Sequence, residues 1–217
     1  MEFTFWTIIS NLILAARWTV VLSLVTFFLG GSIGMIVLLM RISSSWFARN
    51  IAKGYIELFQ GTPLLMQLFL AFFGLALLGF DVPAWLAAGL ALTLWSASFF
   101  AEIWRGCVQS VPTGQSEAAR SLGMGWYQMM MNVIFPQALL LSIPPTVGFL
   151  VQIVKATALT SIIGFVDLSK AGSMISNMTF EPFTVYGLVA VLYFIICWPL
   201  SAISYHLERK LNGSSGN

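Results

Sequence analysis

Charged side chains are scarce in this chain of 217 residues, in which ten Lys and Arg and eight Asp and Glu make up 8% of the sequence. A soluble domain carries about 25% charged residues. So few cations cannot form the basic face of a nucleic-acid-binding protein. Hydrophobic residues make up 59% of the chain, which excludes disorder and exceeds what a soluble core of this size can hide. The composition indicates an integral membrane protein.

Histidine and cysteine are also rare: the chain has only His206, Cys107 and Cys197. The two cysteines are far apart in the sequence, so they imply no disulfide and no metal site. One histidine near a helix end cannot form a Ser–His–Asp or metal-binding constellation. The sequence also lacks the G-x-x-x-x-G-K-[ST] loop that binds ATP. We therefore expect no enzyme activity, metal or cofactor in this chain.

Long intervals without charge predict the membrane-spanning segments. A helix rises 1.5 Å per residue and needs about 20 apolar residues to cross the hydrocarbon core. These apolar runs are continuous rather than alternating, which excludes a β-barrel. The predicted fold is all-α, a single polytopic membrane domain over residues 1–217 with five spans. The spans lie at about 18–40, 58–80, 83–103, 133–154 and 184–206.

The distribution of cations predicts the orientation of the chain. With the N-terminus outside, seven Lys and Arg residues lie on the cytoplasmic side and three lie outside. The opposite topology reverses this score, so the positive-inside rule favours N-out and C-in. Residues 1–17 lack the basic start and cleavage site of a signal peptide. Their apolar side chains fit either an interfacial helix or the start of the first span.

Two residue patterns inside the spans predict helix contacts. Gly30, Gly31, Ser32 and Gly34 are small residues that let helices approach closely in lipid, so they predict a packing face on the first span. Glu102 and Arg105 lie three residues apart, which predicts an ion pair within the third span.

The segment 106–136, between the third and fourth spans, is the most informative stretch of the sequence. Ser116 can cap a helix whose first turn holds Glu117, a favourable place for an acid, and Gly123 is a natural helix end. A helix of about seven residues is marginal alone in water. It therefore packs either on a cytoplasmic partner or on its own spans. Its small and apolar side chains, which would let a partner approach closely, are Ala118, Ala119 and Leu122.

This segment resembles a known family. The E-A-A sequence at 117–119 is followed by three residues and Gly123, and then by nine residues and the V-I-F-P sequence at 133–136. This spacing is similar to the E-A-A loop of ABC importer permeases. Other stretches resemble the polar amino acid branch of that family, the histidine/glutamine/arginine type. These are GTPLL at 61–65, AEIWRG at 101–106, SVPTGQ at 110–115 and KATAL at 155–159.

The resemblance implies an inner-membrane, multi-pass permease subunit of an ATP-driven importer for a polar amino acid. The implied partners are two ABC ATPase subunits that bind ATP and Mg, a second permease chain that is identical or related, an extracytoplasmic substrate-binding protein, and membrane lipid. In this family the E-A-A loop is a coupling helix that sits in a cleft of the ATPase. The implied coupling residues are Glu117, Ala118, Ala119, Leu122, Gly123 and Pro136.

Polar residues inside the spans are costly in lipid, which makes them candidates for the substrate pathway. Thr157, Thr160 and Ser161 share a helix face by the i, i+3, i+4 rule. Lys155 could meet a substrate carboxylate or extend to the outer headgroups. The candidate pathway residues are Glu57, Gln60, Thr62, Gln152, Lys155, Thr157, Thr160 and Ser161.

The sequence departs from the family pattern within these spans. Gln60 stands where the family usually has Arg, which leaves Glu57 to extend towards water or to pair with Lys53 or Arg105. Three other replacements lie in or after the fourth span: Gly148 for Asn, Phe149 for an acid common in carriers of basic amino acids, and Ala158 for Ser. The missing acid disfavours arginine, lysine and histidine as substrates unless a second permease chain supplies one.

Two other classes of function remain open from the residues alone. A membrane scaffold could recruit a partner through the same loop, but it would not need polar residues inside its spans. A carrier that works without an ATPase is disfavoured by five spans with no inverted repeat.

Overall fold

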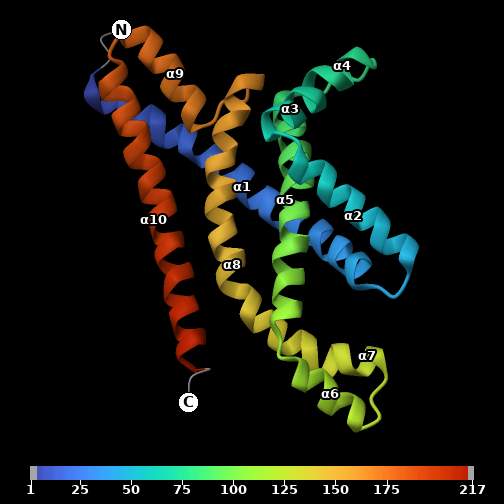
Figure 1. The fold of residues 1–217 in the computed structure, drawn as a ribbon. Coiled ribbons are helices and arrows are strands. Elements are labelled where there is room, and N and C mark those ends of the chain that lie inside the picture. The colour runs from blue at the N-terminus through green and yellow to red at the C-terminus, as the bar shows by residue number, and fades with distance from the viewer. Residues whose placement is uncertain (1–3, 215–217) are drawn as a thin grey trace.

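The computed structural model describes residues 4–214 as a chain of helices (Figure 1). Four helical segments are long and apolar enough to cross a membrane, and a bent helix pair makes a fifth span when it is counted as one. The predicted all-α polytopic class is therefore confirmed. The four long segments are Phe5–Ile42 (α1), Ala84–Ser110 (α5), Trp126–Ile163 and Pro182–Ser214 (α10).

Helix α1 is continuous over 38 residues. Of the two interpretations of residues 1–17, the start of the first span is therefore the right one from Phe5 onward, while residues 1–3 lie outside the described residues. At 1.5 Å per residue α1 is about 57 Å long, well beyond the ~30 Å hydrocarbon core. Such a helix must tilt or project into water, and Figure 1 shows it crossing α5 and α8 obliquely.

The second span, predicted at 58–80, is present only as a bent helix pair that begins earlier, at Trp46. Helix α2 (Trp46–Gly61) and the helix that follows it from Leu64 are bent by 101°. Pro63 causes the break, because it has no N–H and because its ring disfavours a helical conformation at the preceding residue. Thr62 accordingly has extended φ and ψ of −113° and 142°. Beyond the break the chain forms α3 (Leu64–Phe69), the π-helical turn η1 (Leu70–Gly74) and α4 (Leu75–Leu77).

The fourth span begins earlier than the predicted residue 133. The short helices α6 (Thr113–Ser121) and α7 (Trp126–Met129) follow α5, and α7 continues through the π-turn η2 (Met130–Ile134) into α8 (Phe135–Ala156). Pro136 lacks the N–H that would bond to the carbonyl of Asn132, which lies inside η2. The altered hydrogen bonding of a π-turn accommodates that gap without breaking the span. Only residues 122–125 separate α6 from α7, so the chain passes from one short helix to the other through a turn.

The predicted packing of small residues on the first span is confirmed for Gly30 and Gly34, which face α5. A Cβ on Gly34 would lie 2.8 Å from Cβ of Phe100 and 3.0 Å from the carbonyl oxygen of Ala97. A Cβ on Gly30 would collide with Oγ of Ser96. The two helices can therefore approach this closely only because both positions lack a side chain.

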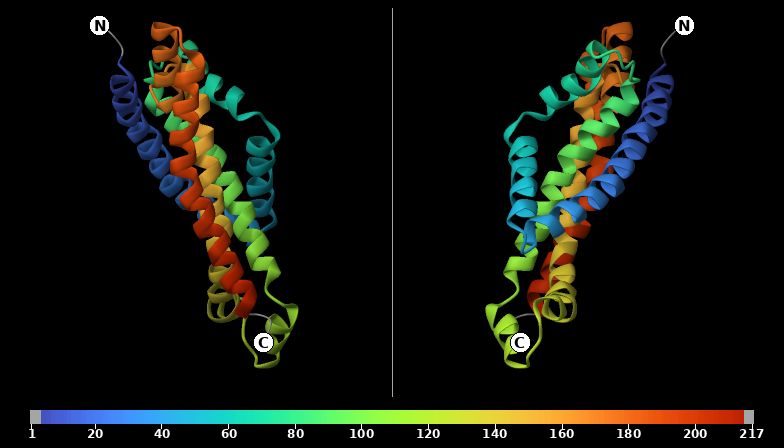
Figure 2. Two further views of the ribbon diagram at one scale, coloured as in Figure 1. Left: turned by 90° about the vertical axis from the view of Figure 1, so that its left-hand side faces the viewer. Right: turned by 90° about the vertical axis from the view of Figure 1, so that its right-hand side faces the viewer.

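The two ends of the molecule carry different elements. Helices α6 and α7 and the end of α10 lie at one end, and the start of α1 and helix α9 (Leu168–Thr179) lie at the other (Figures 1 and 2). Helix α9 was not expected from the sequence. The 3₁₀ helix η3 (Thr157–Ile163) precedes it and continues α8. The excess of cations in the loop segments of the α6–α7 end favours that end as the cytoplasmic one.

Candidate functional site: the cytoplasmic loop and the polar residues of the spans

Helix α6 starts four residues earlier than a cap at Ser116 predicts, and Ser116 is not its cap. The helix begins directly after Pro112, and Oγ of Ser116 donates to the carbonyl of Thr113 at 2.7 Å. Proline has a φ that suits the start of a helix, so Pro112 sets the boundary. The nine residues of α6 still make fewer than three turns, which leaves the helix dependent on packing.

The predicted end of this helix at Gly123 is confirmed. Gly123 has a φ of +76°, a conformation that glycine adopts without strain. Its N–H donates to the carbonyl of Arg120 at 2.9 Å, and the N–H of Met124 donates to the carbonyl of Ala119 at 3.1 Å. These two bonds are those of a Schellman motif. The loop therefore turns sharply at Gly123 and returns towards α7.

The two alanines of α6 face different surroundings. Ala119 is only 3% exposed and packs in an apolar cluster with Met130 and Ile134 of η2. Ala118 and Glu117 are exposed, and Leu122 is 77% exposed. The expectation that both alanines are open to a partner is therefore wrong for Ala119, which holds α6 onto its own chain. One face of α6 is anchored to the start of the fourth span, and the opposite face is open.

An ion-pair network joins the first and third spans near the cytoplasmic end. The guanidinium of Arg105 donates hydrogen bonds to both carboxylate oxygens of Glu102 at 2.6 to 2.9 Å, as the i, i+3 spacing predicted. Nε of Arg41 lies 3.7 Å from the same carboxylate, a contact between α1 and α5 that the sequence pattern did not reveal. The carboxylate of Glu102 therefore pairs with two arginines, one on α1 and one on α5.

The polar residues of the second span mostly have structural partners. Glu57 pairs with Lys53 at 3.6 Å on the exposed side of α2, which selects one of the two partners considered for it. Nε2 of Gln60 donates to the carbonyl of Ser98 on α5 at 3.1 Å. Thr62 donates to the carbonyl of Leu58 at 2.8 Å. Gln60 therefore links α2 to α5 where the family usually has a cation.

The polar residues in and after α8 do not all lie on one face. Thr157 and Thr160 are fully buried, and their hydroxyls donate to the carbonyls of Val154 and Thr157. The segment is a 3₁₀ helix with three residues per turn, so Ser161 leaves the face that an α-helix would give it. Gln152 and Lys155 point outward and are exposed. The predicted shared face is therefore confirmed for Thr157 and Thr160, which lie three residues apart, and is wrong for Ser161.

Phe149 belongs to an aromatic cluster between α5 and α8. Its ring stacks on Phe99 at a centroid distance of 5.4 Å and meets Phe100 edge to face at 4.9 Å. A carboxylate at this position would be buried among apolar rings, which is costly without a partner. Gly148 beside it faces α10, where an added Cβ would lie 3.1 Å from Oγ of Ser204. Both departures from the family pattern thus have a packing reason.

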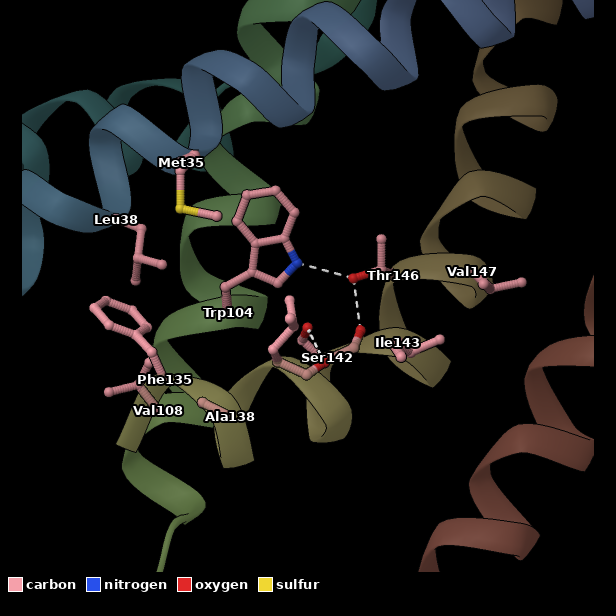
Figure 3. Close-up of a pocket in the computed structure, with 11 residues that line it drawn as sticks. Met35, Leu38, Trp104, Val108, Phe135, Ala138, Ser142, Ile143, Thr146 and Val147 are labelled. Carbon is pink, nitrogen blue, oxygen red and sulfur yellow. Dashed lines mark hydrogen bonds between the residues drawn. The ribbon is translucent and has the colours of Figure 1, made fainter. Parts of the chain in front are cut away.

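A cavity of about 250 Å³ lies between α1, α5 and the first half of α8 (Figure 3). Nε1 of Trp104 crosses it to donate to Oγ1 of Thr146 at 2.8 Å, and Thr146 donates to the carbonyl of Ser142 at 2.6 Å. Its walls are otherwise apolar and include none of the predicted pathway residues. The cavity is therefore an apolar space beside the fourth span and not a polar binding site.

A buried carboxylate at the opposite end was missed by the sequence analysis. Asp167 caps α9 by accepting from the N–H of Lys170 at 2.9 Å, and it also accepts from the hydroxyl of Tyr193 on α10 at 3.2 Å. Tyr193 is in turn 2.9 Å from Oγ of Ser169. An Asp three residues before Lys170 at the start of an apolar helix was the available signal. Among the described residues no group of three or more His, Cys, Asp or Glu could hold a metal.

We expect Asp167 to make the stability of the protein depend on pH. Burial raises the pKa of its carboxyl above the usual 3.8, against the opposing effect of its hydrogen bonds. A raised pKa means that the folded state prefers the protonated acid, so this contribution to stability is complete below pH ~4 and is lost as the pH rises through the raised pKa. Asp167→Asn keeps the cap but cannot titrate. Thermal unfolding in detergent across pH 3.5–7 should show a flatter pH dependence for the variant, and an unchanged one would contradict this assignment.

Comparison with known proteins agrees with this architecture. Residues 30–213 match the family described as "Binding-protein-dependent transport system inner membrane component". The chain is 35% identical over 193 residues to the probable amino-acid ABC transporter permease protein YckA of Bacillus subtilis, covering 89% of this chain and 85% of that protein. It is 33% identical over 203 residues to the histidine/lysine/arginine/ornithine transport system permease protein HisM of Salmonella typhimurium, covering 89% and 85%.

Solved structures extend the agreement to the fold. A chain from a crystal structure of an amino acid ABC transporter with histidines superimposes with a TM-score of 0.90 at 34% identity, covering 97% of this chain and 100% of that one. A chain of the MetNI methionine ABC transporter gives a TM-score of 0.72 at 22% identity, which shows a shared fold. This chain belongs to the polar amino acid permeases of ABC transporters, inner-membrane components of binding-protein-dependent systems in which separate subunits hydrolyse ATP.

Proposed function

We propose that this chain forms half of the transmembrane pathway of an importer for a polar amino acid, and that α6 is its coupling helix. Two ATPase subunits bind ATP and Mg and engage the cytoplasmic loops of two permease chains, identical or related. An extracytoplasmic binding protein delivers the substrate. The named relatives support an amino acid as substrate, since their transport systems are described for glutamine, nopaline, cystine, arginine and histidine.

The two-sided packing of α6 carries this proposal. Its outer face presents Glu117, Ala118 and Leu122 to the cytoplasm, and its inner face is fixed by Ala119 to η2 at the start of the fourth span. The Schellman turn at Gly123 holds α6 against that span. Force applied to the outer face therefore reaches α8 through packed side chains. Pro136 is the second residue of α8, so the force passes there from η2 into the long helix of the fourth span.

For the substrate pathway we propose the predicted polar side chains that are exposed on the helix surfaces. Gln152 and Lys155 are exposed on the outer half of the fourth span, and Glu57 is exposed on α2. Other polar groups shape the backbone around them by donating hydrogen bonds to backbone carbonyls. Ser161 donates to the carbonyl of Ala158 at 2.7 Å, and the bonds of the others are given above: Gln60, Thr62, Thr157 and Thr160. The aromatic cluster around Phe149 supports an amino acid without a cationic side chain, because it leaves no acid there to pair with one.

Reversing the charge of Glu117 tests the coupling. Glu117→Lys replaces an exposed acid on α6 with a cation, and a misplaced charge in an interface costs several kcal/mol. We expect ATP-dependent uptake in proteoliposomes with the ATPase and binding protein to fall at least about tenfold, since ~1.4 kcal/mol changes an equilibrium that much. The affinity of the binding protein for its amino acid should not change.

Glu208→Lys is the matched control, because Glu208 is also exposed near the same end but lies on α10. Its uptake should stay near that of the unmodified chain. Normal uptake by Glu117→Lys at equal abundance would refute the coupling role. Uptake without any ATPase would instead favour a carrier, and a complex that binds ATPase but moves no substrate would favour a scaffold.

A further inference from the structure

The break in the second span leaves a backbone acceptor without its normal donor. In a continuous helix the carbonyl of Phe59 would accept from the N–H of residue 63, but that residue is proline. The carbonyls at the end of α2 therefore need other donors, and in a membrane water is not freely available to supply them. A helix end of this kind inside a span is costly unless a side chain satisfies it.

Gln67 supplies the missing donor. Its Nε2 lies 2.9 Å from the carbonyl oxygen of Phe59, 3.1 Å from the carbonyl oxygen of Thr62 and 2.9 Å from Oγ1 of Thr62. Thr62 can accept there because its own hydrogen is donated to the carbonyl of Leu58. One carboxamide on α3 thus bonds back across the bend to the last turn of α2 and to the residue in the break.

The position of Gln67 makes this contact specific to the bend. The side chain is only 9% exposed, and its neighbour Leu68 is fully buried against α5, so α3 cannot rotate freely to release it. On the other side of the break, Tyr55 and Gln60 tie α2 to the carbonyls of Leu94 and Ser98 on α5. Both arms of the bend are therefore fixed to the same helix, and Gln67 is the side chain that joins them directly.

We propose that Gln67 is a positioning residue for transport: its carboxamide replaces the amide that Pro63 lacks and thereby fixes the 101° angle between α2 and the segment 64–77 that begins with α3. This inference rests on the proposed function, because it assigns a role in the same importer. Losing the carboxamide leaves a buried acceptor unsatisfied at the bend. The two arms then sample straighter arrangements, and the second span no longer presents a single geometry during transport.

The experiment measures the bend directly. Spin labels are placed at Asn50 on α2 and Leu77 at the end of α4, which are both exposed, in a chain whose Cys107 and Cys197 are replaced by Ser. Pulsed electron–electron double resonance in nanodiscs should give one narrow distribution of the distance between the two labels for the unmodified sequence. Gln67→Leu should broaden it and add a population at longer distance, and uptake should fall about tenfold as for a lost buried hydrogen bond.

Gln137→Leu is the matched control, because Nε2 of Gln137 donates only to the carbonyl of Val133, within its own continuous segment. It should leave the labelled distance unchanged. If Gln67→Leu does not fold, Gln67→Asn carries the test, since it stays polar but is one methylene too short to span the break.

The outcomes separate the two proposals. Loss of uptake in Gln67→Leu with an unchanged distance distribution would overturn the positioning role, and so would an altered distribution with normal uptake. Failure of the unmodified chain to transport with its ATPases would instead refute the proposed function, whatever the distances show.

Discussion

Replacing Gly34 with leucine is expected to prevent the transporter from assembling. A single added Cβ would already lie 2.8 Å from Phe100 Cβ and 3.0 Å from the backbone oxygen of Ala97. Phe100 is fully buried, and backbone atoms of α5 cannot move aside without moving the helix. Overpacking a core usually costs about 1–3 kcal/mol. We expect a cost above that range here, because a whole helix must separate from its partner.

The measurement is the amount of monodisperse protein recovered from membranes, followed by its thermal unfolding. Gly34→Leu should give little folded protein, and Gly34→Ala an intermediate amount with a lower Tm. Gly54→Leu is the control, because Gly54 is also in a helix but has no atom within 4 Å of its added Cβ. Equal yield and Tm for Gly34→Leu and Gly54→Leu would show that α1 and α5 can separate without cost.

Replacing Leu122 with aspartate is expected to release the ATPase while leaving the permease folded. Leu122 is the most exposed apolar side chain of the α6 turn, at 77%, so its removal opens no cavity within the chain. Buried apolar anchors at the centre of an interface cost about 2 kcal/mol or more when lost, which corresponds to roughly a thirtyfold loss of affinity. An introduced charge that must be desolvated adds to this cost.

Titration of purified ATPase against the permease in nanodiscs would measure this loss. Phe180→Asp provides the control, because Phe180 is also highly exposed but lies at the opposite end of the molecule. Its φ of 57° is a conformation that Asp tolerates better than most residues. ATPase affinity should be unchanged in this control. If Leu122→Asp binds ATPase as tightly as the unmodified chain, the docking surface does not include the α6 turn.

Sequence patterns predicted those features that depend on residues close together in the chain. Uncharged intervals located the spans because lipid excludes charge everywhere along a helix. The end of α6 at Gly123 and the Glu102–Arg105 pair were predictable for the same reason, since a turn and an i, i+3 contact are both local.

The features that were missed depend on contacts between distant segments. The size of the bend at Pro63 depends on Gln67 and on how α3 packs against α5, and neither contact follows from a local pattern. The contact of Arg41 with Glu102 and the cap of Asp167 with Tyr193 join residues that are 61 and 26 positions apart. Ala119 belongs to the same group, because only the fold decides which of two adjacent alanines faces inward.

The two π-turns have a consequence for how insertions and deletions would act on these spans. A π-turn holds one residue more than the α-helical pattern around it, so η1 and η2 behave as single-residue insertions inside continuous helices. Removing one residue from η2 would restore regular α-helix and rotate the flanking segments relative to each other by about 100°. Ala119 contacts one side of that turn, and Thr146 meets Trp104 beyond it. The extra residue in η2 thus sets the rotation of α8 relative to α7. With this rotation the fourth span can contact α6 at its start and α5 further along the helix.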